Sequence, residues 1–288
     1  MSDTLTGGHE HAVHKAETFE VRVLRQDAPG ERSYWERFGL ELEPDMNVTS
    51  VLQRIAAVAK TTDGAAVAPV AYESNCLEEV CGSCTMLING RTRQACSALV
   101  AKLLAEQPGE IELSPMSKFP VVRDLVVNRR RLFRALEKAK AWNPVDGYYD
   151  LGPGPRQSPE QQQQQYPLSQ CMSCGCCLEA CPQYRQIDVE QLPTEADEAY
   201  QTRADAEYDR DFIGAHAISQ VVLYNTNPIG AQTAGERLNA LMSEGGIQMC
   251  GKAQNCVVVC PKAIPLTTSI ARAARATTVQ AIKSWFDR

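Results

Sequence analysis

Twelve cysteines, gathered in three groups, are the residues of this 288-residue chain whose type and spacing most clearly indicate chemistry. The groups span residues 76–96, 171–181 and 250–260, and the rest of the sequence contains none. Cysteines that served only as small core residues would be scattered. The N-terminus lacks the apolar segment of a secretory signal, so we expect a cytoplasmic chain, where structural disulfides are rare. The grouping therefore favours metal ligands or redox groups.

The first group has the spacing C-x4-C-x2-C-x11-C, within NCLEEVCGSCTMLINGRTRQAC. This is the plant-type arrangement for a [2Fe–2S] cluster, whose two irons share two sulfides and need four thiolates. Gly82 lets the backbone approach and direct N–H groups at sulfur, and a tight turn is predicted at Asn89-Gly90. Zinc is the alternative, although its sites usually pair two short C-x2–4-C segments. The predicted [2Fe–2S] ligands are Cys76, Cys81, Cys84 and Cys96.

The second group, CMSCGCCLEACP, follows the ferredoxin pattern C-x2-C-x2-C-x3-C-P, whose fourth cysteine binds the other of two clusters. That exchange predicts a second copy of the motif. Residues 250–261, CGKAQNCVVVCP, provide one, with Ala253 where the second cysteine would stand. The chain therefore contains one complete and one incomplete ferredoxin motif.

Exchange of the fourth ligands produces two unequal sites. One has four thiolates and suits a [4Fe–4S] cluster, with predicted ligands Cys171, Cys174, Cys177 and Cys260. The other has three, and a cube corner without a protein ligand is readily lost, so a [3Fe–4S] cluster is expected. Its predicted ligands are Cys181, Cys250 and Cys256. A [4Fe–4S] cluster with an exogenous fourth ligand is the alternative.

Two further residues near these motifs receive structural interpretations. Cys176 is left over and is expected to be a small buried residue, although the sequence leaves open that it competes as a ligand. His216 lies in an apolar helical context and is expected to be a satisfied core histidine. No set of acid, base and nucleophile is recognisable, so we predict no catalytic residue.

The N-terminal half has the pattern of a small α+β domain. Residues 18–25 and 34–42 alternate as strands around a hairpin turn at Pro29-Gly30, and further strands are predicted at 67–73, 84–89 and 110–114. A helix between them begins at an N-cap on Thr49 or Ser50. Its apolar face comprises Val51, Leu52, Ile55, Ala56 and Val58.

The C-terminal half reads as mainly helical. A helix is predicted over 121–141, with a basic side that is either solvated or docks to a partner: Arg129, Arg130, Arg131, Arg134 and Lys138. Residues 143–157 resemble a linker, and Ser158-Pro159-Glu160-Gln161 is a capping-box helix start. Later helices are expected near 195–206, 210–224, 234–243 and 266–285. The predicted organisation is a flexible tail over 1–17, a [2Fe–2S] domain over 18–120, a connecting helix and linker over 121–165, and an α-helical cluster domain over 166–288.

Composition narrows the function classes. Twenty-nine basic residues against 35 acidic ones give a net charge of −6, which argues against nucleic-acid binding. No apolar run approaches the ~18 residues that a membrane span needs. With 44% hydrophobic residues the chain has material for about two globular cores.

In the order of its motifs, the chain resembles the iron–sulfur subunit of succinate dehydrogenase and fumarate reductase. The resemblance runs from about residue 18 to 285 and is carried by CLEEVCGSC, CMSCGCCLEACP, FIGAHAISQ (212–220) and NCVVVCPKAIPLTTSIA (255–271). It implies a β-grasp, plant-type ferredoxin-like N-terminal domain and an all-α ferredoxin-like C-terminal domain. The family's ligand pattern falls on the same three cysteine sets.

The resemblance also implies partners. Electrons would pass from the flavin of a succinate-oxidising FAD flavoprotein, through [2Fe–2S], [4Fe–4S] and [3Fe–4S] clusters, to quinone at an integral membrane anchor. The chain is then expected as a peripheral subunit on the cytoplasmic face of the cell membrane, with the third cluster nearest the lipid. Members that use ubiquinone carry a His and a Trp where this chain has Gly251 and 183–186 without Trp. It is more similar to members that work with menaquinone and a haem-b membrane subunit.

Three other functions remain open at this point. Fumarate reductase passes electrons through the same series of clusters in the reverse direction. The sequence does not determine the direction of transfer. A different flavin dehydrogenase, of glycolate or heterodisulfide type, generally has complete ligand sets in its helical domain, unlike Ala253 here. The alternative from another class is a zinc-stabilised binding module.

Overall fold

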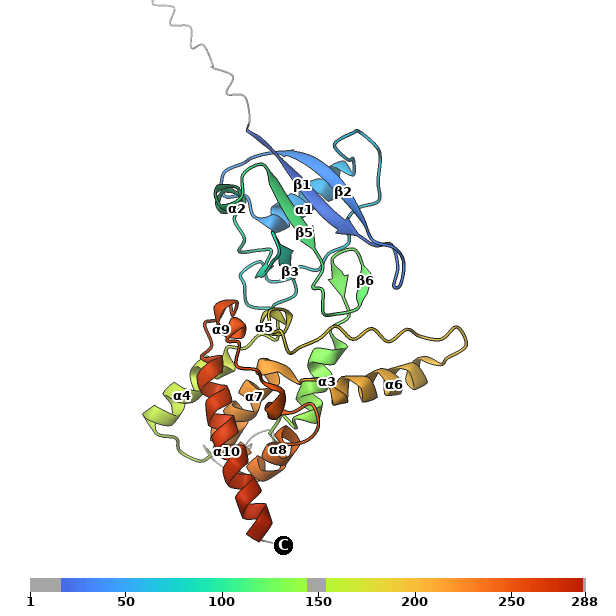
Figure 1. The fold of residues 1–288 in the computed structure, drawn as a ribbon. Coiled ribbons are helices and arrows are strands. Elements are labelled where there is room, and N and C mark those ends of the chain that lie inside the picture. The colour runs from blue at the N-terminus through green and yellow to red at the C-terminus, as the bar shows by residue number, and fades with distance from the viewer. Residues whose placement is uncertain (1–16, 144–153, 287–288) are drawn as a thin grey trace, which may run out of the picture.

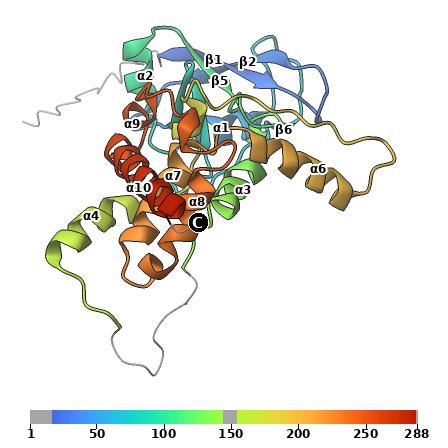
Figure 2. The ribbon, with the colours of Figure 1, turned by 60° about the horizontal axis from the view of Figure 1, so that its bottom comes forward.

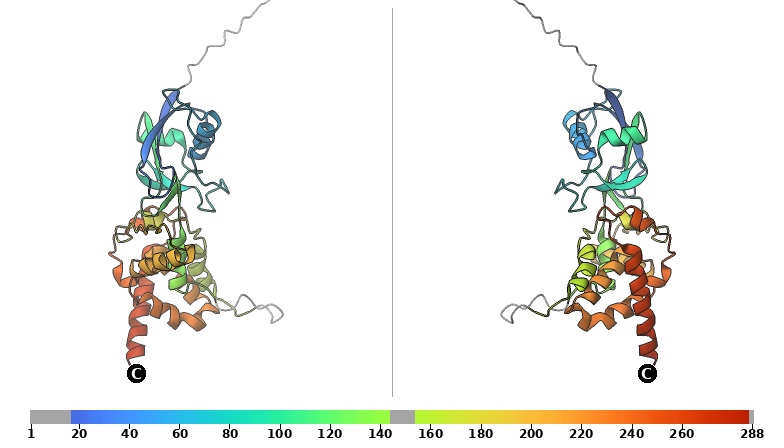
Figure 3. Two further views of the ribbon diagram at one scale, coloured as in Figure 1. Left: turned by 90° about the vertical axis from the view of Figure 1, so that its right-hand side faces the viewer. Right: turned by 90° about the vertical axis from the view of Figure 1, so that its left-hand side faces the viewer.

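The computed structural model describes residues 17–143 and 154–286. They form a sheet domain and a helical domain stacked end to end (Figure 1). The cysteine-bearing helices α5 (Cys176–Glu179) and α9 (Asn255–Val258) lie at the end of the helical domain that meets the sheet domain. The two side views in Figure 3 show the same stacking. The predicted tail over 1–17 lies outside the described residues except for residue 17, and so does most of the predicted linker.

The sheet domain has the predicted α+β architecture. Its five strands have the order β2-β1-β5-β3-β4, with β1 antiparallel to β2 and parallel to β5. Val21 and Val23 on the interior strand β1 are fully buried. The elements are β1 Thr18–Arg25, β2 Tyr34–Glu41, α1 Val48–Val58, β3 Thr85–Ile88, β4 Arg91–Gln94, α2 Val100–Glu106 and β5 Glu110–Ser114.

The first helix differs in detail from the sequence prediction. Its N-cap is Asn47, whose side chain accepts from the backbone N–H of Ser50 at 2.9 Å, so the predicted cap on Thr49 or Ser50 is wrong. Val51, Leu52 and Ile55 are buried as expected, whereas Ala56 is half-buried and Val58 is exposed. The apolar face is therefore shorter than predicted.

The predicted strand over 67–73 is absent from the described residues, because its backbone is satisfied elsewhere. Ala71 donates its N–H to Asp124 at 2.8 Å and accepts from the N–H of Leu125 at 3.1 Å. The buried guanidinium of Arg25 pairs with the same Asp124 carboxylate at 2.8 Å. One buried acidic residue thus ties this segment to β1 in place of a strand pairing.

The predicted helix over 121–141 is also wrong in its first part. Residues 121–127 form a short hairpin, β6 Val121–Arg123 and β7 Val126–Val127, which turns at Asp124 with a positive φ of 47°. The helix α3 covers only Arg130–Lys138. The contacts that hold Asp124 favour the hairpin over the helical turn that the apolar pattern suggested.

The basic side of α3 is half-exposed, and three of its arginines form ion pairs within the chain. It packs on the acidic helix α6, Asp197–Arg210, which extends beside it (Figures 1 and 2). The pairs are Arg130 with Asp205, Arg134 with Asp209, and the buried Arg131 with Asp211 just after α6. These charges therefore hold the helical domain together.

The helical domain contains the predicted helices. Ser158 caps α4 with both reciprocal hydrogen bonds of a capping box, to and from Gln161, as predicted. No strand is present among described residues of this domain, and no described helix is long and apolar enough to cross a membrane. The remaining elements are α4 Pro159–Ser169, α5 Cys176–Glu179, α7 Gly214–Thr226, η1 Gly230–Thr233, α8 Ala234–Leu241, η2 Ile247–Met249, α9 Asn255–Val258 and α10 Leu266–Phe286.

Candidate metal centres

The predicted [2Fe–2S] cysteines converge at one end of the sheet. Asn89 and Gly90, at φ 49° and 69°, form the predicted tight turn between β3 and β4. The hairpin places Cys84, directly before β3, opposite Ala95, whose N–H donates to the Cys84 carbonyl at 3.1 Å. Cys96 follows at once, so the last two predicted ligands lie side by side.

The loop before β3 presents backbone N–H groups to its own sulfur atoms. The N–H groups of Glu78 and Val80 lie 3.4 Å from Cys76 Sγ, and that of Ser83 lies 3.5 Å from Cys81 Sγ. Such donors favour the thiolate form. Hydrogen bonding from the Ser83 side chain lowers the pKa of Cys81 to about 6, whereas burial raises the pKa of Cys96 to about 11.

Gly82 also has a role beyond the predicted one. The N–H groups that reach sulfur belong to nearby residues of its loop, and Gly82, at φ +76°, is one of the places where the two domains touch. A Cβ atom there would lie 2.9 Å from both Cα and Cβ of Cys174. Only glycine lets the first cysteine loop approach the second so closely.

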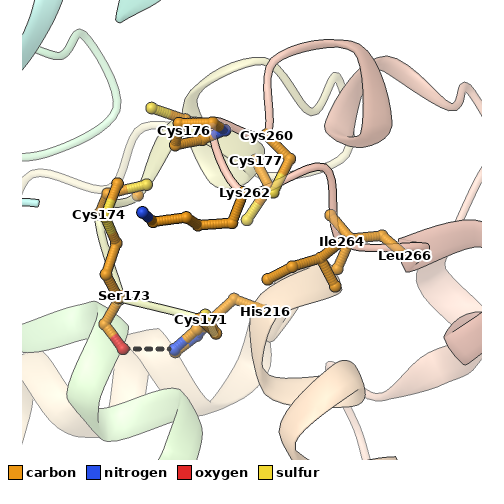
Figure 4. A pocket seen from close by; sticks show the side chains of 13 residues that line it. Cys171, Ser173, Cys174, Cys176, Cys177, His216, Cys260, Lys262, Ile264 and Leu266 are labelled. Carbon is orange, nitrogen blue, oxygen red and sulfur yellow. Dashed lines mark hydrogen bonds between the residues drawn. The ribbon is translucent and has the colours of Figure 1, made fainter. Parts of the chain in front are cut away.

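Five cysteines line one cavity of the helical domain (Figure 4). Four of them, all except Cys176, are the predicted [4Fe–4S] ligands. Three come from the loop and helix of the second motif, and Cys260 comes from the end of the third. Cys177 is half-buried, and burial raises the pKa of its thiol well above the usual value, so a metal that binds there has to displace its proton. The cavity gathers the set that ligand exchange requires.

A second cavity, of about 290 Å³, is lined by Cys181, Cys250 and Cys256. It thus contains the last cysteine of the second motif and the first two of the third, which are the predicted [3Fe–4S] ligands. Ala253 lines the same cavity and offers no ligand atom. Burial raises the pKa of Cys256.

The backbone confirms that the two motifs are repeats in the expected register. In the second motif, Ser173 and Gly175 have φ 51° and 89°; in the third, Lys252 and Gln254 have φ 57° and 64°. Each pair lies two and four residues after the first cysteine and directly precedes a short helix, α5 or α9. Ala253 therefore occupies the position that Cys174 has in the complete motif.

Cys176 is buried, as expected for a small core residue. Its sulfur accepts from Gln94 Nε2 on β4 at 3.5 Å, across the contact between the domains. Cys176 also lines the cavity that contains the predicted [4Fe–4S] ligands. The alternative interpretation, in which it competes as a ligand, therefore stays a prediction.

Helix α5 is fastened to the sheet domain by side chains that the sequence interpretation missed. The buried Glu179 accepts from the N–H groups of Ser117 and Lys118 at 2.9 and 3.1 Å. Arg129 donates to the carbonyl oxygens of Gly82 and Ser83 at 2.7 and 2.5 Å. Contacts between residues so far apart leave no periodic pattern in the sequence. The one signal in the sequence is the acidic Glu179 inside a cysteine motif, because a buried charge requires a partner.

The residues at the two departures from ubiquinone-type proteins are in contact. A Cβ atom on Gly251 would lie 2.7 Å from Gln183 Nε2, so the Gln183 side chain fills the space that a larger residue at 251 would need. Both residues line the cavity with Cys250. Gly251 and Gln183 thus form one local arrangement rather than two unrelated differences.

The fit of the predicted clusters is judged from the side chains around each set of cysteines. Among residues 17–143 and 154–286, no group of three or more His, Cys, Asp or Glu is placed to hold a single metal ion. The support for iron–sulfur clusters comes from the two cysteine-lined cavities and from the N–H donors around Cys76 and Cys81. These surroundings, rich in thiols and N–H groups, suit iron–sulfur clusters.

Comparison with known proteins agrees with this arrangement. Residues 20–134 match the family model of a 2Fe-2S iron-sulfur cluster binding domain, and residues 167–264 match that of a 4Fe-4S dicluster domain. The chain is 46% identical to the succinate dehydrogenase iron-sulfur subunit of Bacillus subtilis over 95% of this chain and 98% of that protein. It is 27% identical to the fumarate reductase iron-sulfur subunit of Wolinella succinogenes, over 87% and 93%.

A solved structure shares the fold. A chain of the Mycobacterium smegmatis Sdh1 complex in the apo form superposes with a TM-score of 0.69, at 22% identity, over 92% of this chain and 97% of that one. The predicted fold class, a ferredoxin-like sheet domain followed by a helical ferredoxin-like domain, is therefore confirmed.

Proposed function

The chain belongs to the family of succinate dehydrogenase iron–sulfur subunits, and from this premise we propose which of its residues form the electron path. Members of this family transfer electrons through [2Fe–2S], [4Fe–4S] and [3Fe–4S] clusters, as the sequence predicted. The fumarate reductase reading is not better supported, since that relative is 27% identical against 46%.

The proposed ligands are the eleven cysteines outside position 176. Cys76, Cys81, Cys84 and Cys96 hold the [2Fe–2S] cluster; Cys171, Cys174, Cys177 and Cys260 hold the [4Fe–4S] cluster; Cys181, Cys250 and Cys256 hold the [3Fe–4S] cluster. The observation that carries this proposal is the exchange of cysteines between the two cavities. Cys260 joins the second motif's cavity, and Cys181 joins the third's.

The order of transfer follows from contacts between the sets. When bound, each cluster accepts and releases one electron, which divides the pair that a flavin delivers. Gly82 on the first loop touches Cys174 on the second, so the first two sites are adjacent. Cys177 lies in the first turn of α5 and Cys181 lies two residues after its end, so this short helix joins the second site to the third. These contacts support an order in which the [4Fe–4S] site lies between the other two.

The ends of this row need a donor and an acceptor. We infer a complex with an FAD flavoprotein that oxidises succinate and an integral membrane anchor, with the chain peripheral on the cytoplasmic face. The cavity of Cys250 is the proposed end near the quinone. Menaquinone and a haem-b anchor are proposed because the chain has Gly251, and no Trp over 183–186, where ubiquinone-type members carry a His and a Trp.

The test is low-temperature EPR of the purified complex, oxidised and then reduced with dithionite. Three cluster signals, one of them the three-iron type, are expected. In Cys250→Ser the three-iron signal and quinone reduction should be lost, while succinate oxidation by a flavin-level dye persists. A colourless, diamagnetic protein that contains zinc would refute the proposal. Ubiquinone reduction by a complex without haem would refute only the quinone type.

A further inference from the structure

The charged residues of this chain are distributed unevenly along the sequence. The chain has 35 acidic residues, yet residues 245–286 contain none of them. This segment comprises the loop of Cys250, helix α9 and the whole of helix α10. It has five basic residues: Lys252, Lys262, Arg272, Arg275 and Lys283. A chain with a net charge of −6 therefore has one long segment that is purely cationic.

Three of these cations gather at one place on α10. Arg272, Arg275 and Lys283 are exposed, and all three line one hollow of about 330 Å³. Val279 lines the same hollow and is 45% exposed, so an apolar surface adjoins the charges. Arg and Lys side chains that converge in this way suit the phosphate of an anionic headgroup.

The C-terminal end of α10 exposes large apolar side chains. Ile282, Trp285 and Phe286 are 53%, 73% and 74% exposed, and the centroids of the two aromatic rings lie 5.1 Å apart. This end of the helix projects beyond the rest of the helical domain (Figures 1 and 3). Basic residues beside Trp and Phe are typical of helices that lie in the interface of a lipid bilayer.

This apolar end lies on the same face of α10 as the cavity of Cys250, the proposed end near the quinone. Ala271 and Ala274, on the first half of the helix, line that cavity. Residues three or four apart lie on one face of a helix, and such steps lead from Ala274 to Ile282 and Trp285. The surface that reaches the cavity therefore continues to the exposed aromatic residues.

We propose that the outer side of α10 rests directly on anionic phospholipid of the membrane. The residues of this α10 surface are Arg272, Arg275, Ile282, Lys283, Trp285 and Phe286. The basic side chains lie at the headgroup phosphates, and the apolar side chains enter the hydrocarbon below them, because phosphate and hydrocarbon adjoin at this boundary. The inference rests on the proposed function, in which the cavity of Cys250 faces the membrane. Contact with lipid then keeps that cavity turned toward the quinone.

The test is binding of the cluster-loaded full chain to vesicles, measured by sedimentation of its visible absorbance. Vesicles of phosphatidylglycerol and phosphatidylcholine in equal parts should bind the chain, and vesicles of phosphatidylcholine alone should bind it far less. Each basic residue at an anionic surface contributes about fivefold to the affinity, so Arg275→Gln combined with Lys283→Gln should weaken binding about 25-fold. Trp285→Ala should weaken it about tenfold, because the indole no longer enters the lipid.

Matched controls make the same chemical changes elsewhere on the surface. Arg32→Gln combined with Arg91→Gln removes two exposed charges from the sheet domain, and Trp142→Ala removes a Trp that is 49% exposed and lies outside the cationic segment. Both controls should bind the mixed vesicles like the unmodified chain. Added salt should weaken binding of the unmodified chain, because it screens exposed charges.

Several results would overturn the inference without affecting the proposed function. They are the absence of binding to the mixed vesicles, equal binding to both kinds of vesicle, and undiminished binding of the α10 variants. Normal vesicle binding by these variants, with loss of the anchor when the complex is purified in detergent, would also overturn it, because α10 would then dock on the anchor. The α10 variants replace no proposed cluster ligand, so all three EPR cluster signals should remain in them. Signals that are missing from the unmodified complex would overturn the proposed function itself.

Discussion

The contact of Gly82 with Cys174 predicts that a single methyl group at position 82 separates the first two sites. Gly82→Ala places a Cβ atom 2.9 Å from Cα and Cβ of Cys174. Carbon atoms normally approach to about 3.5–4.0 Å, so the two loops must move apart by about 0.6–1.1 Å. Gly30→Ala is the matched control, because Gly30 has the same φ of +76° and nothing within 4 Å of its added Cβ.

Both variants place an L-residue in the left-handed region, which costs about 1–2 kcal/mol. Only Gly82→Ala adds an overpacking cost, of about 1–3 kcal/mol. We therefore expect Gly82→Ala to unfold at a lower temperature than Gly30→Ala. The unfolding is measured by the loss of visible cluster absorbance on heating. Succinate oxidation by a flavin-level dye should be normal in both, whereas succinate:quinone turnover should fall only in Gly82→Ala. Equal stability and equal quinone turnover in the two variants would refute the proposed contact between the sites.

Three further predictions concern the other sites and the helical domain. Ala253→Cys should supply the missing thiolate and convert the three-iron EPR signal to a four-iron one; an unchanged signal would contradict the repeat register. Cys176→Ala should retain all three cluster signals, whereas Cys174→Ala should lose the [4Fe–4S] signal; loss of a cluster in Cys176→Ala would make that residue a ligand. Asp211→Asn removes a buried partner of Arg131 and should lower the free energy of unfolding by about 3–5 kcal/mol. The exposed Glu207→Gln should change it by about 0.5 kcal/mol or less in the same denaturation assay, and equal losses would contradict the buried pair.

Local signals were the part of the fold that the sequence could predict. The capping box at Ser158 depends on residues three apart, and the turn at Asn89-Gly90 on two adjacent residues with positive φ. The cysteine spacing belongs to the same class, because each loop must wrap around its own cluster. The exchange of the fourth ligands is a prediction of the same kind, since it follows from the motif itself.

The segments that were mispredicted depend on partners far away in the sequence. Residues 67–73 have an apolar pattern typical of a strand, yet their backbone bonds to the loop at Asp124. That loop is held by Arg25, 99 residues earlier in the chain, which also breaks the predicted helix over 121–141. The basic side of α3 was misread for the same reason, because its acidic partners lie on α6.

The junction between the domains explains why electron transfer needs more than the cysteines. Three polar contacts meet around α5: Glu179 receives N–H groups from the sheet domain, Gln94 donates to Cys176, and Arg129 holds the carbonyl of Gly82. Each buries a polar group that would be costly without its partner, so a shifted junction is disfavoured at several points together. Tunnelling between one-electron sites depends steeply on distance, and a row of sites divided between two domains therefore requires a rigid joint. The cysteines fix where iron can bind; the polar contacts around α5 fix how far apart the first two sites remain.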